Sequence, residues 1–252
     1  MGGAILEGML SSQLHEPSEV LVCEHAPERR AYWQERGVQV TGAEADLRGV
    51  QTLVIAVKPQ GFPAAAGELG FLEHSTLVIS VMAGIDSSQI RDALGSKVRV
   101  IRVMPNTPCG IGMGISALAM GTGAETKDLE EAVRLMSTIG QVVTVEESAM
   151  HAVTATSGSG PAYLFHLAEA WIDAGIGVGL SPEAARTLVV ETIRGSAELL
   201  KRDGDPVELR RQVTSPGGTT AAGIQKLEEQ GLTKMMQDAV RAAHARSEEL
   251  GR

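Results

Sequence analysis

The sequence predicts an α/β protein with a doubly wound, Rossmann-like dinucleotide-binding domain over residues 1–147 and an all-α domain over residues 148–252. In the first part, nearly continuous apolar runs alternate with helical patterns, which is typical of a parallel sheet covered on both faces. After Glu147 the strand-like runs stop, and the remaining sequence has helical periodicity interrupted by proline and glycine.

Six short apolar runs supply the predicted strands, at residues 20–23, 52–57, 76–81, 98–103, 115–120 and 141–145. Ligands of doubly wound sheets bind outside the carboxyl ends of the strands. We therefore expect the segments that follow three of these runs to line one crevice. They are Lys58-Pro59, Met82-Ala83-Gly84 and Met104-Pro105-Asn106.

The second part contains the helical patterns 163–174, 182–201, 206–213, 221–229 and 232–250. Ser181 precedes a proline at a first helical position, and Asp205 opens a sequence similar to a capping box. Apolar residues such as Leu188, Val189 and Val190 exceed what so small a bundle must bury. We therefore expect an oligomer interface in this domain.

The composition excludes several classes of protein. Hydrophobic residues make up 43%, which is typical of a globular chain, whereas a net charge of −9 and 3% aromatic residues argue against nucleic-acid or anionic-membrane partners. No apolar run approaches the roughly 20 residues of a membrane span, and the N-terminus does not resemble a signal peptide. Two cysteines, Cys23 and Cys109, are expected to be free thiols in a reducing cytoplasm. The histidine spacing predicts no structural metal.

The most informative stretch is Thr-Ser-Pro-Gly-Gly-Thr-Thr at residues 214–220, directly before a helical pattern. Pro216 is expected at a first helical position, and two glycines allow a ligand to approach the backbone closely. The unpaired N–H groups and the dipole of a helix start favour an anion. This stretch predicts a carboxylate or phosphate site, with an ordinary helix cap as the alternative.

Three further motifs accompany this turn: Ala-Val-Lys-Pro-Gln at 56–60, Val-Met-Pro-Asn-Thr-Pro at 103–108 and Ser-Gly-Ser-Gly-Pro-Ala-Tyr at 157–163. The last of them is expected to form a loop before a helix. Together the four motifs, in this order, resemble pyrroline-5-carboxylate reductases, and the resemblance runs from Met1 to about Arg246. That family makes proline by reducing a cyclic imine with a nicotinamide cofactor. The resemblance also implies a dimer formed through the helical domain.

The resemblance assigns roles to individual residues. It implies that the substrate carboxylate is held by the N–H groups of Gly218 and Thr219, and that the Thr220 hydroxyl contacts the imine nitrogen and helps to deliver its proton. Further substrate-site candidates are Ser215, Glu146 and Gln212, and Ser157, Ser159 and Tyr163 are candidates for shaping the pocket. The implied cofactor-binding residues are Gly2, Ala56, Val57, Lys58, Pro59, Val81, Met82, Ala83 and Asn106.

The N-terminus departs from the expected pattern. A dinucleotide fold begins with a strand and a Gly-x-Gly-x-x-Gly turn, of which Gly2 resembles the third glycine. Without the first strand, we expect two exposed sheet edges and an apolar slot. We hypothesise that Met1 is an internal methionine and that the gene starts on the order of ten residues upstream.

The cofactor is expected to be NADPH or NADH. Glu24 suits a ribose 2′-hydroxyl and favours NADH, whereas Arg29 and Arg30 suit a 2′-phosphate. The habit of the family favours NADPH. Two alternative functions stay open: a related imine or 2-hydroxyacid-type reductase, and a non-catalytic nucleotide-binding protein that oligomerises.

Overall fold

The computed structural model describes residues 1–251, which form two compact units. The first unit contains Met1–Ser159 together with the segment that begins at Ala243, and the second is Gly160–Ala242. This division differs from the predicted boundary after residue 147. Residues 148–159 and the segment from Ala243 pack with the sheet-containing unit.

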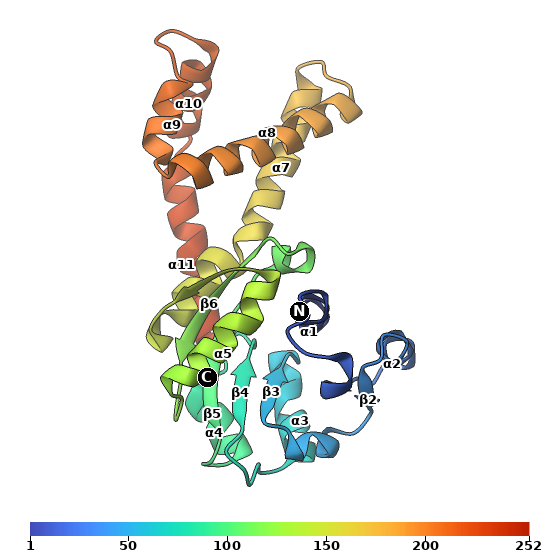
Figure 1. The fold of residues 1–252 in the computed structure, drawn as a ribbon. Helices are drawn as coiled ribbons and strands as arrows, with labels where there is room; N and C mark the ends of the chain where they lie inside the picture. Colours follow the sequence, from blue (N-terminus) through green and yellow to red (C-terminus); the bar gives the residue numbers. More distant parts are fainter. Residues whose placement is uncertain (252) are drawn as a thin grey trace. The chain divides into compact units, whose positions relative to one another are not determined.

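The first unit contains a five-stranded sheet and a separate pair of strands (Figure 1). The sheet has the order β3 (Thr52–Ile55), β4 (Leu77–Ser80), β5 (Arg99–Met104), β6 (Gly114–Met120) and β7 (Gly140–Thr144). The pair is β1 (Leu21–Cys23) and β2 (Gln39–Thr41), which are parallel. The strand β2 was not predicted.

The predicted parallel sheet is confirmed for β3, β4 and β5, but the prediction is wrong where β6 joins β5. The strands β3, β4 and β5 are parallel, but β6 is antiparallel to β5, and β7 is parallel to β6. Residues 105–113, which join β5 to β6, are too few for a parallel crossover, because such a connection takes about a dozen residues or more.

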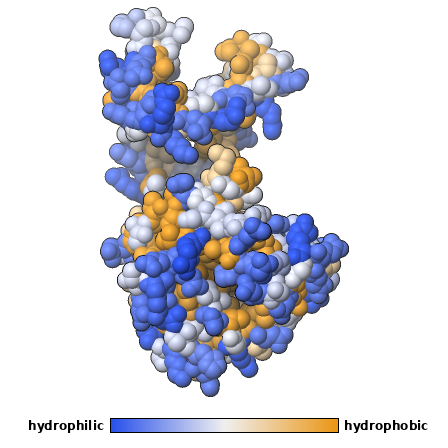
Figure 2. Space-filling model, viewed as in Figure 1, coloured by the Kyte–Doolittle hydropathy of each residue, from blue (hydrophilic) through white to orange (hydrophobic). Residues whose placement is uncertain are grey.

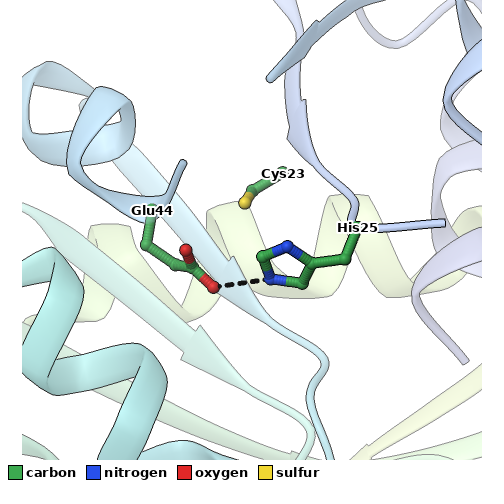
Figure 3. Close-up of side chains that lie close together, drawn as sticks. All are labelled: Cys23, His25 and Glu44. Atoms are coloured by element: carbon green, nitrogen blue, oxygen red, sulfur yellow. Dashed lines mark hydrogen bonds and ion pairs between the residues drawn. The ribbon is translucent and has the colours of Figure 1, made fainter. Parts of the chain in front are cut away.

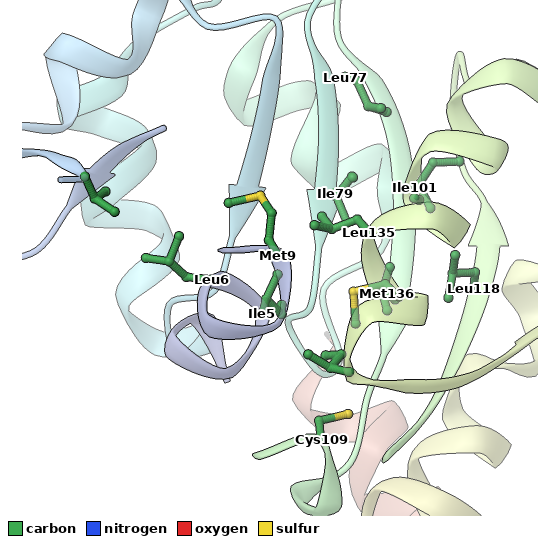
Figure 4. Close-up of a cluster of buried hydrophobic side chains, with 14 of the residues drawn as sticks. Ile5, Leu6, Met9, Leu77, Ile79, Ile101, Cys109, Leu118, Leu135 and Met136 are labelled. Atoms are coloured by element: carbon green, nitrogen blue, oxygen red, sulfur yellow. The ribbon is translucent and has the colours of Figure 1, made fainter. Parts of the chain in front are cut away.

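Helices cover both faces of this sheet. Neighbouring residues of β4 point to opposite faces: Leu77 and Ile79 belong to one hydrophobic cluster, drawn in Figure 4, and Val78 belongs to the other. The α-helices of the unit are α1 (Gly2–Ser11), α2 (Pro27–Gln34), α3 (Phe62–Leu69), α4 (Ser87–Leu94), α5 (Thr126–Met136), α6 (Met150–Val153) and the end of α11 (Leu232–Leu250). The expected doubly covered sheet is therefore confirmed.

A gap separates β1 of the strand pair from β3 of the main sheet. The strand β1 pairs only with β2, and β3 pairs only with β4, so each has an unpaired edge within the described residues. A cavity of about 1360 Å³ borders both edges and is lined by apolar side chains that include Leu6, Met9 and Val54. The expected slot is present.

The second unit is helical, with α7 (Gly160–Gly177), α8 (Pro182–Asp203), α9 (Pro206–Gln212), α10 (Thr219–Glu229) and most of α11 (Leu232–Leu250). The predicted caps are confirmed, since Ser181 accepts a hydrogen bond from the Ala184 N–H and Asp205 accepts one from the Val207 N–H. Figure 2 shows hydrophobic side chains at the surface of these helices.

The motif at residues 157–163 was expected to form a loop before a helix, and this expectation is wrong. Residues Thr154–Gly158 form a π-helical turn that leads directly into α7. Its defining bond runs from the Ser159 N–H to the Thr154 carbonyl, at 2.8 Å. The Thr154 and Ser157 hydroxyls donate to carbonyls one turn earlier, so hydroxyl side chains support the turn locally.

Candidate active site

The carboxyl edge of β3, β4 and β5 collects most of the predicted cofactor residues. Ile55 is level with Ser80 across the β3–β4 ladder, and Ser80 with Arg102 across the next. The segment 56–59 and the segment 81–83 therefore leave the sheet at the same edge, where the Val81 N–H donates to the Ile55 carbonyl at 3.1 Å. Lys58 is exposed, and Met82 is buried.

Asn106 lies at this edge too, after the end of β5. Its side-chain oxygen accepts a hydrogen bond from the Ile115 N–H at 3.0 Å, which ties the β5–β6 connection to the start of β6. Gly158 of the π-helical turn also contacts this region, because a Cβ atom there would lie 2.6 Å from the Met104 Cε. Sequence reasoning gave Gly158 no role.

The start of α1 faces the end of β3. A Cβ atom on Gly2 would lie 3.0 Å from the Cβ of Ala56, a close approach that favours glycine. Met1 is the N-cap residue and supplies no side-chain hydrogen bond, so the first N–H groups of α1 have no partner within the helix. A helix start of this kind fits an anionic pyrophosphate, and Gly2 therefore suits the predicted cofactor role.

Charged side chains surround the end of β1. Glu24 accepts a hydrogen bond from the Ala26 N–H at 3.1 Å and pairs with Arg29 at 3.0 Å. The backbone N–H of Ala26, together with the Arg29 guanidinium, lowers the pKa of Glu24. The carboxylate is thus already engaged by Arg29. The Arg30 guanidinium packs over Gly42, where a Cβ atom would lie 2.6 Å from its Nη1.

Cys23, His25 and Glu44 come together in the same region, although their spacing in the sequence predicted no metal site. One ligand atom from each lies within 4.8 Å of the others. Figure 3 shows the Cys23, His25 and Glu44 side chains close together, with a dashed line joining the His25 ring to the Glu44 carboxylate. Burial, followed by the charge of Glu44, raises the pKa of the Cys23 thiol.

The predicted substrate turn belongs to the second unit. The Gly218 N–H donates to the Ser215 carbonyl at 3.1 Å, and Gly217 has a φ of +71°, so residues 215–218 form a β-turn with Pro216 at its second position. Two expectations are therefore wrong: Pro216 is not the first helical residue, and the Gly218 N–H is not free for a ligand.

The helix α10 begins at Thr219 and has no side-chain cap. Its first backbone bond of the α-helical type runs from the Ala222 N–H to the Gly218 carbonyl. The N–H groups of Thr219, Thr220 and Ala221 consequently have no partner within the helix and point out of its start. Both threonines are exposed. This helix start can still bind an anion, but its free donors are the N–H groups of Thr219, Thr220 and Ala221 rather than those of Gly218 and Thr219.

Two weaker candidates lie elsewhere. Gln212, at the end of α9, donates to the Glu208 carboxylate at 3.1 Å. Glu146 follows β7, which runs opposite to β3, β4 and β5, so this carboxylate leaves the sheet away from the edge that carries Lys58.

Sequence reasoning missed the neighbour of Glu146. The Glu147 carboxylate accepts hydrogen bonds from the N–H and the hydroxyl of Ser87, at 2.8 and 2.7 Å. It also pairs with the buried Arg102 at 3.3 Å. This network attaches the segment after β7 to the start of α4, which is a structural role.

Comparisons with known proteins identify both parts of the chain. Residues 147–250 match the family model for pyrroline-5-carboxylate reductase dimerisation, and residues 1–84 match that for NADP oxidoreductase, coenzyme F420-dependent. Among curated relatives, the pyrroline-5-carboxylate reductase of Synechocystis sp. is 38% identical, over 100% of this chain and 95% of its own length. That of Mycobacterium tuberculosis is 37% identical, over 99% and 94%.

Solved structures agree with this. A pyrroline-5-carboxylate reductase from Coxiella burnetii has a TM-score of 0.91 and 31% identity, covering 100% of this chain and 95% of its own. The Plasmodium falciparum pyrroline carboxylate reductase with NADP bound has a TM-score of 0.89 and 29% identity, over 100% and 95%. The chain belongs to the pyrroline-5-carboxylate reductase family.

Proposed function

We propose that this protein reduces 1-pyrroline-5-carboxylate to L-proline with NADPH or NADH. The observation that carries the proposal is the full-length similarity to reductases of that name, at 38% identity for the Synechocystis protein. The carboxyl-edge crevice of the first unit and the uncapped start of α10 in the second unit supply the two kinds of binding site that this reaction needs.

In the first unit, the start of α1 at Gly2 would hold the cofactor pyrophosphate, and the segments 56–59 and 81–83 would line the crevice. When bound, the cofactor supplies a hydride to the carbon of the ring C=N bond. Glu24 would accept a hydrogen bond from a ribose hydroxyl. Its pairing with Arg29 leaves the site compatible with either cofactor, and the bound NADP of the Plasmodium falciparum relative supports NADPH.

In the second unit, we assign the substrate carboxylate to the N–H groups of Thr219 and Thr220, because the Gly218 N–H is already bonded. The Thr220 hydroxyl would donate a hydrogen bond to the ring nitrogen, which must gain a proton as the carbon gains hydride. A threonine hydroxyl is too weak an acid to lose its proton on its own, so water must resupply it. Ser215 supports the turn that carries these groups.

We further propose a homodimer built through the helical unit. Among its described residues, only Ala185 and Val189 are buried hydrophobic side chains, whereas Phe165 is 62% and Leu188 is 55% exposed. Apolar surface of this extent marks an interaction surface. The two free cysteines are consistent with a reducing cytoplasm, where we place the protein. No helix among the described residues is long and apolar enough to span a membrane.

The direct test follows NADPH absorbance with 1-pyrroline-5-carboxylate and identifies the product. We expect oxidation that depends on the imine and yields proline in equal amount. A protein that binds NADPH but oxidises none of it with this imine contradicts the proposal. Oxidation with other imines or with 2-oxoacids alone would instead favour a related reductase.

A further inference from the structure

A second cluster of reactive side chains lies outside the proposed substrate site and flanks Glu24, which we assign to the cofactor ribose. The Cys23 thiol, the His25 imidazole and the Glu44 carboxylate each offer an atom within 4.8 Å of the other two. Cys23 ends β1, His25 follows two residues later, and Glu44 begins the turn after β2. Because β1 and β2 are parallel and in register from Leu21 to Cys23, their carboxyl ends bring these residues to one edge.

The cluster has an unused oxygen. Glu44 Oε1 bonds the His25 Nε2 at 2.9 Å, whereas the buried Glu44 Oε2 has no geometric hydrogen bond among the described residues and has the carboxyl group of Glu68 as its polar neighbour. A buried carboxylate oxygen without a partner is costly, because it loses water and gains nothing in exchange. A cation bound to this oxygen would remove that cost.

The charges around the cluster also favour a cation. The carboxyl group of Glu68, near the end of α3, lies beside that of Glu44. The negative charges of the Asp46 and Glu24 carboxylates also raise the pKa of the Cys23 thiol. The arrangement of α3 against this edge is fixed by Arg48, whose guanidinium donates to the Glu68 carbonyl at 3.0 Å. The negative groups are therefore held near one another by the fold.

We infer that Cys23, His25 and Glu44 form a zinc-binding site. Thiolate, imidazole and carboxylate together are the donor set that zinc accepts, whereas magnesium and calcium prefer oxygen alone. Binding releases the thiol proton, and the neutral imidazole, with its proton on the other ring nitrogen, gives up its hydrogen bond to Glu44 and binds the metal. Water or Glu68 supplies the fourth ligand.

The present spacing is compatible with this geometry after small side-chain movements. Zinc bonds of about 2.0–2.3 Å in a tetrahedron separate the ligand atoms by roughly 3.3–3.7 Å, and the three atoms now lie within 4.8 Å. The His25 side chain is 68% exposed, so it is free to rotate toward the metal. Glu44 is 14% exposed and supplies the fixed point of the site.

Cobalt titration of the reduced, metal-free protein tests the site directly. Thiolate bound to Co²⁺ gives a near-ultraviolet charge-transfer band, and we expect this band to saturate at one Co²⁺ per chain and to be displaced by Zn²⁺. Cys23→Ser should abolish the band, and His25→Ala should weaken Co²⁺ binding at least tenfold. The matched control is His166→Ala. His166 is also an exposed histidine paired with a glutamate, but it does not belong to the cluster that contains Cys23.

The outcomes are decisive in either direction, provided that each variant keeps the circular dichroism spectrum of the parent. A band that is lost in Cys23→Ser, weakened in His25→Ala and unchanged in His166→Ala supports the site. A parent protein without the band, or a band that survives Cys23→Ser and thus arises from Cys109, overturns it. The readout does not involve imine reduction, so it stands apart from the test of the proposed function.

Discussion

Replacing Thr220 by alanine tests the chemical role of the α10 start most directly. The side chain is exposed at the second residue of the helix. Its loss therefore costs little packing, and the higher helix propensity of alanine favours the fold by roughly 0.5 kcal/mol. Any loss of activity must come from the missing hydroxyl. A hydrogen bond to a group that gains charge contributes about 1.5–3 kcal/mol.

At about 1.36 kcal/mol for each factor of ten, kcat/KM for the imine should fall about 13- to 160-fold in Thr220→Ala. Steady-state kinetics with 1-pyrroline-5-carboxylate and an NADPH-binding titration measure the two effects separately. Thr220→Ser should recover most of the rate, because it keeps the hydroxyl. Thr219→Ala should change kcat/KM by less than about threefold, because we assign to Thr219 only its backbone N–H.

The reasoning fails if Thr220→Ser is as slow as Thr220→Ala, since the hydroxyl would then not be the group that acts. It fails equally if the affinity for NADPH falls in parallel with the rate, because we assign Thr220 to the substrate alone. Equal losses in Thr219→Ala and Thr220→Ala would point to a general disturbance of the helix start.

Three further changes probe the first unit. Asp128→Ala should lower the free energy of unfolding, measured by urea denaturation, by about 3 kcal/mol, because it removes the buried partner of Arg99. Asp203→Ala, which removes an exposed partner of Arg202, should have no measurable effect, and equal losses in the two variants would contradict this. Burial raises the pKa of Asp86, but the hydrogen bonds at the start of α4 lower it more, so the ionised carboxylate stabilises the fold at neutral pH. Asp86→Asn should therefore destabilise the protein at pH 7, and the difference in melting temperature should shrink below about pH 4 as the carboxylate of the parent is protonated. A difference in melting temperature that is constant with pH refutes this. Gly2→Val should raise KM for NADPH about tenfold or more, because the added atoms overlap Ala56; an unchanged KM would remove Gly2 from the cofactor site.

The strands of the main sheet could be predicted because buried parallel strands are nearly continuous apolar runs, and residues 52–57 and 76–81 are of this kind. Their direction was harder to predict. The strand β6 is antiparallel to β5 because the connection between them is short, and the apolar pattern of the strands does not predict strand direction. The strand β2 was missed because Gln39-Val40-Thr41 is short and two of its three residues are polar.

Site residues could be predicted where they belong to one local motif. They could not be predicted where the site forms from segments that are distant in the sequence. The uncapped start at Thr219 follows from the local sequence, but the bond that removes the Gly218 N–H depends on the conformation of the turn. The approach of Glu44 to Cys23 requires the pairing of β1 with β2, which no spacing between the two residues reveals.

The order in which the chain is synthesised constrains how the first unit reaches its final structure. The chain leaves this unit after Ser159 and rejoins it only at Ala243. Gln89 then donates to the Gly251 carbonyl at 3.0 Å, and His151 bonds the buried Ser247 hydroxyl at 2.9 Å. At roughly 5–20 residues per second, a ribosome spends several seconds on residues 160–242 before these partners emerge. The nucleotide-binding unit therefore cannot be completed in N-to-C order during translation, and nascent chains halted before residue 243 should be more sensitive to proteases than released ones.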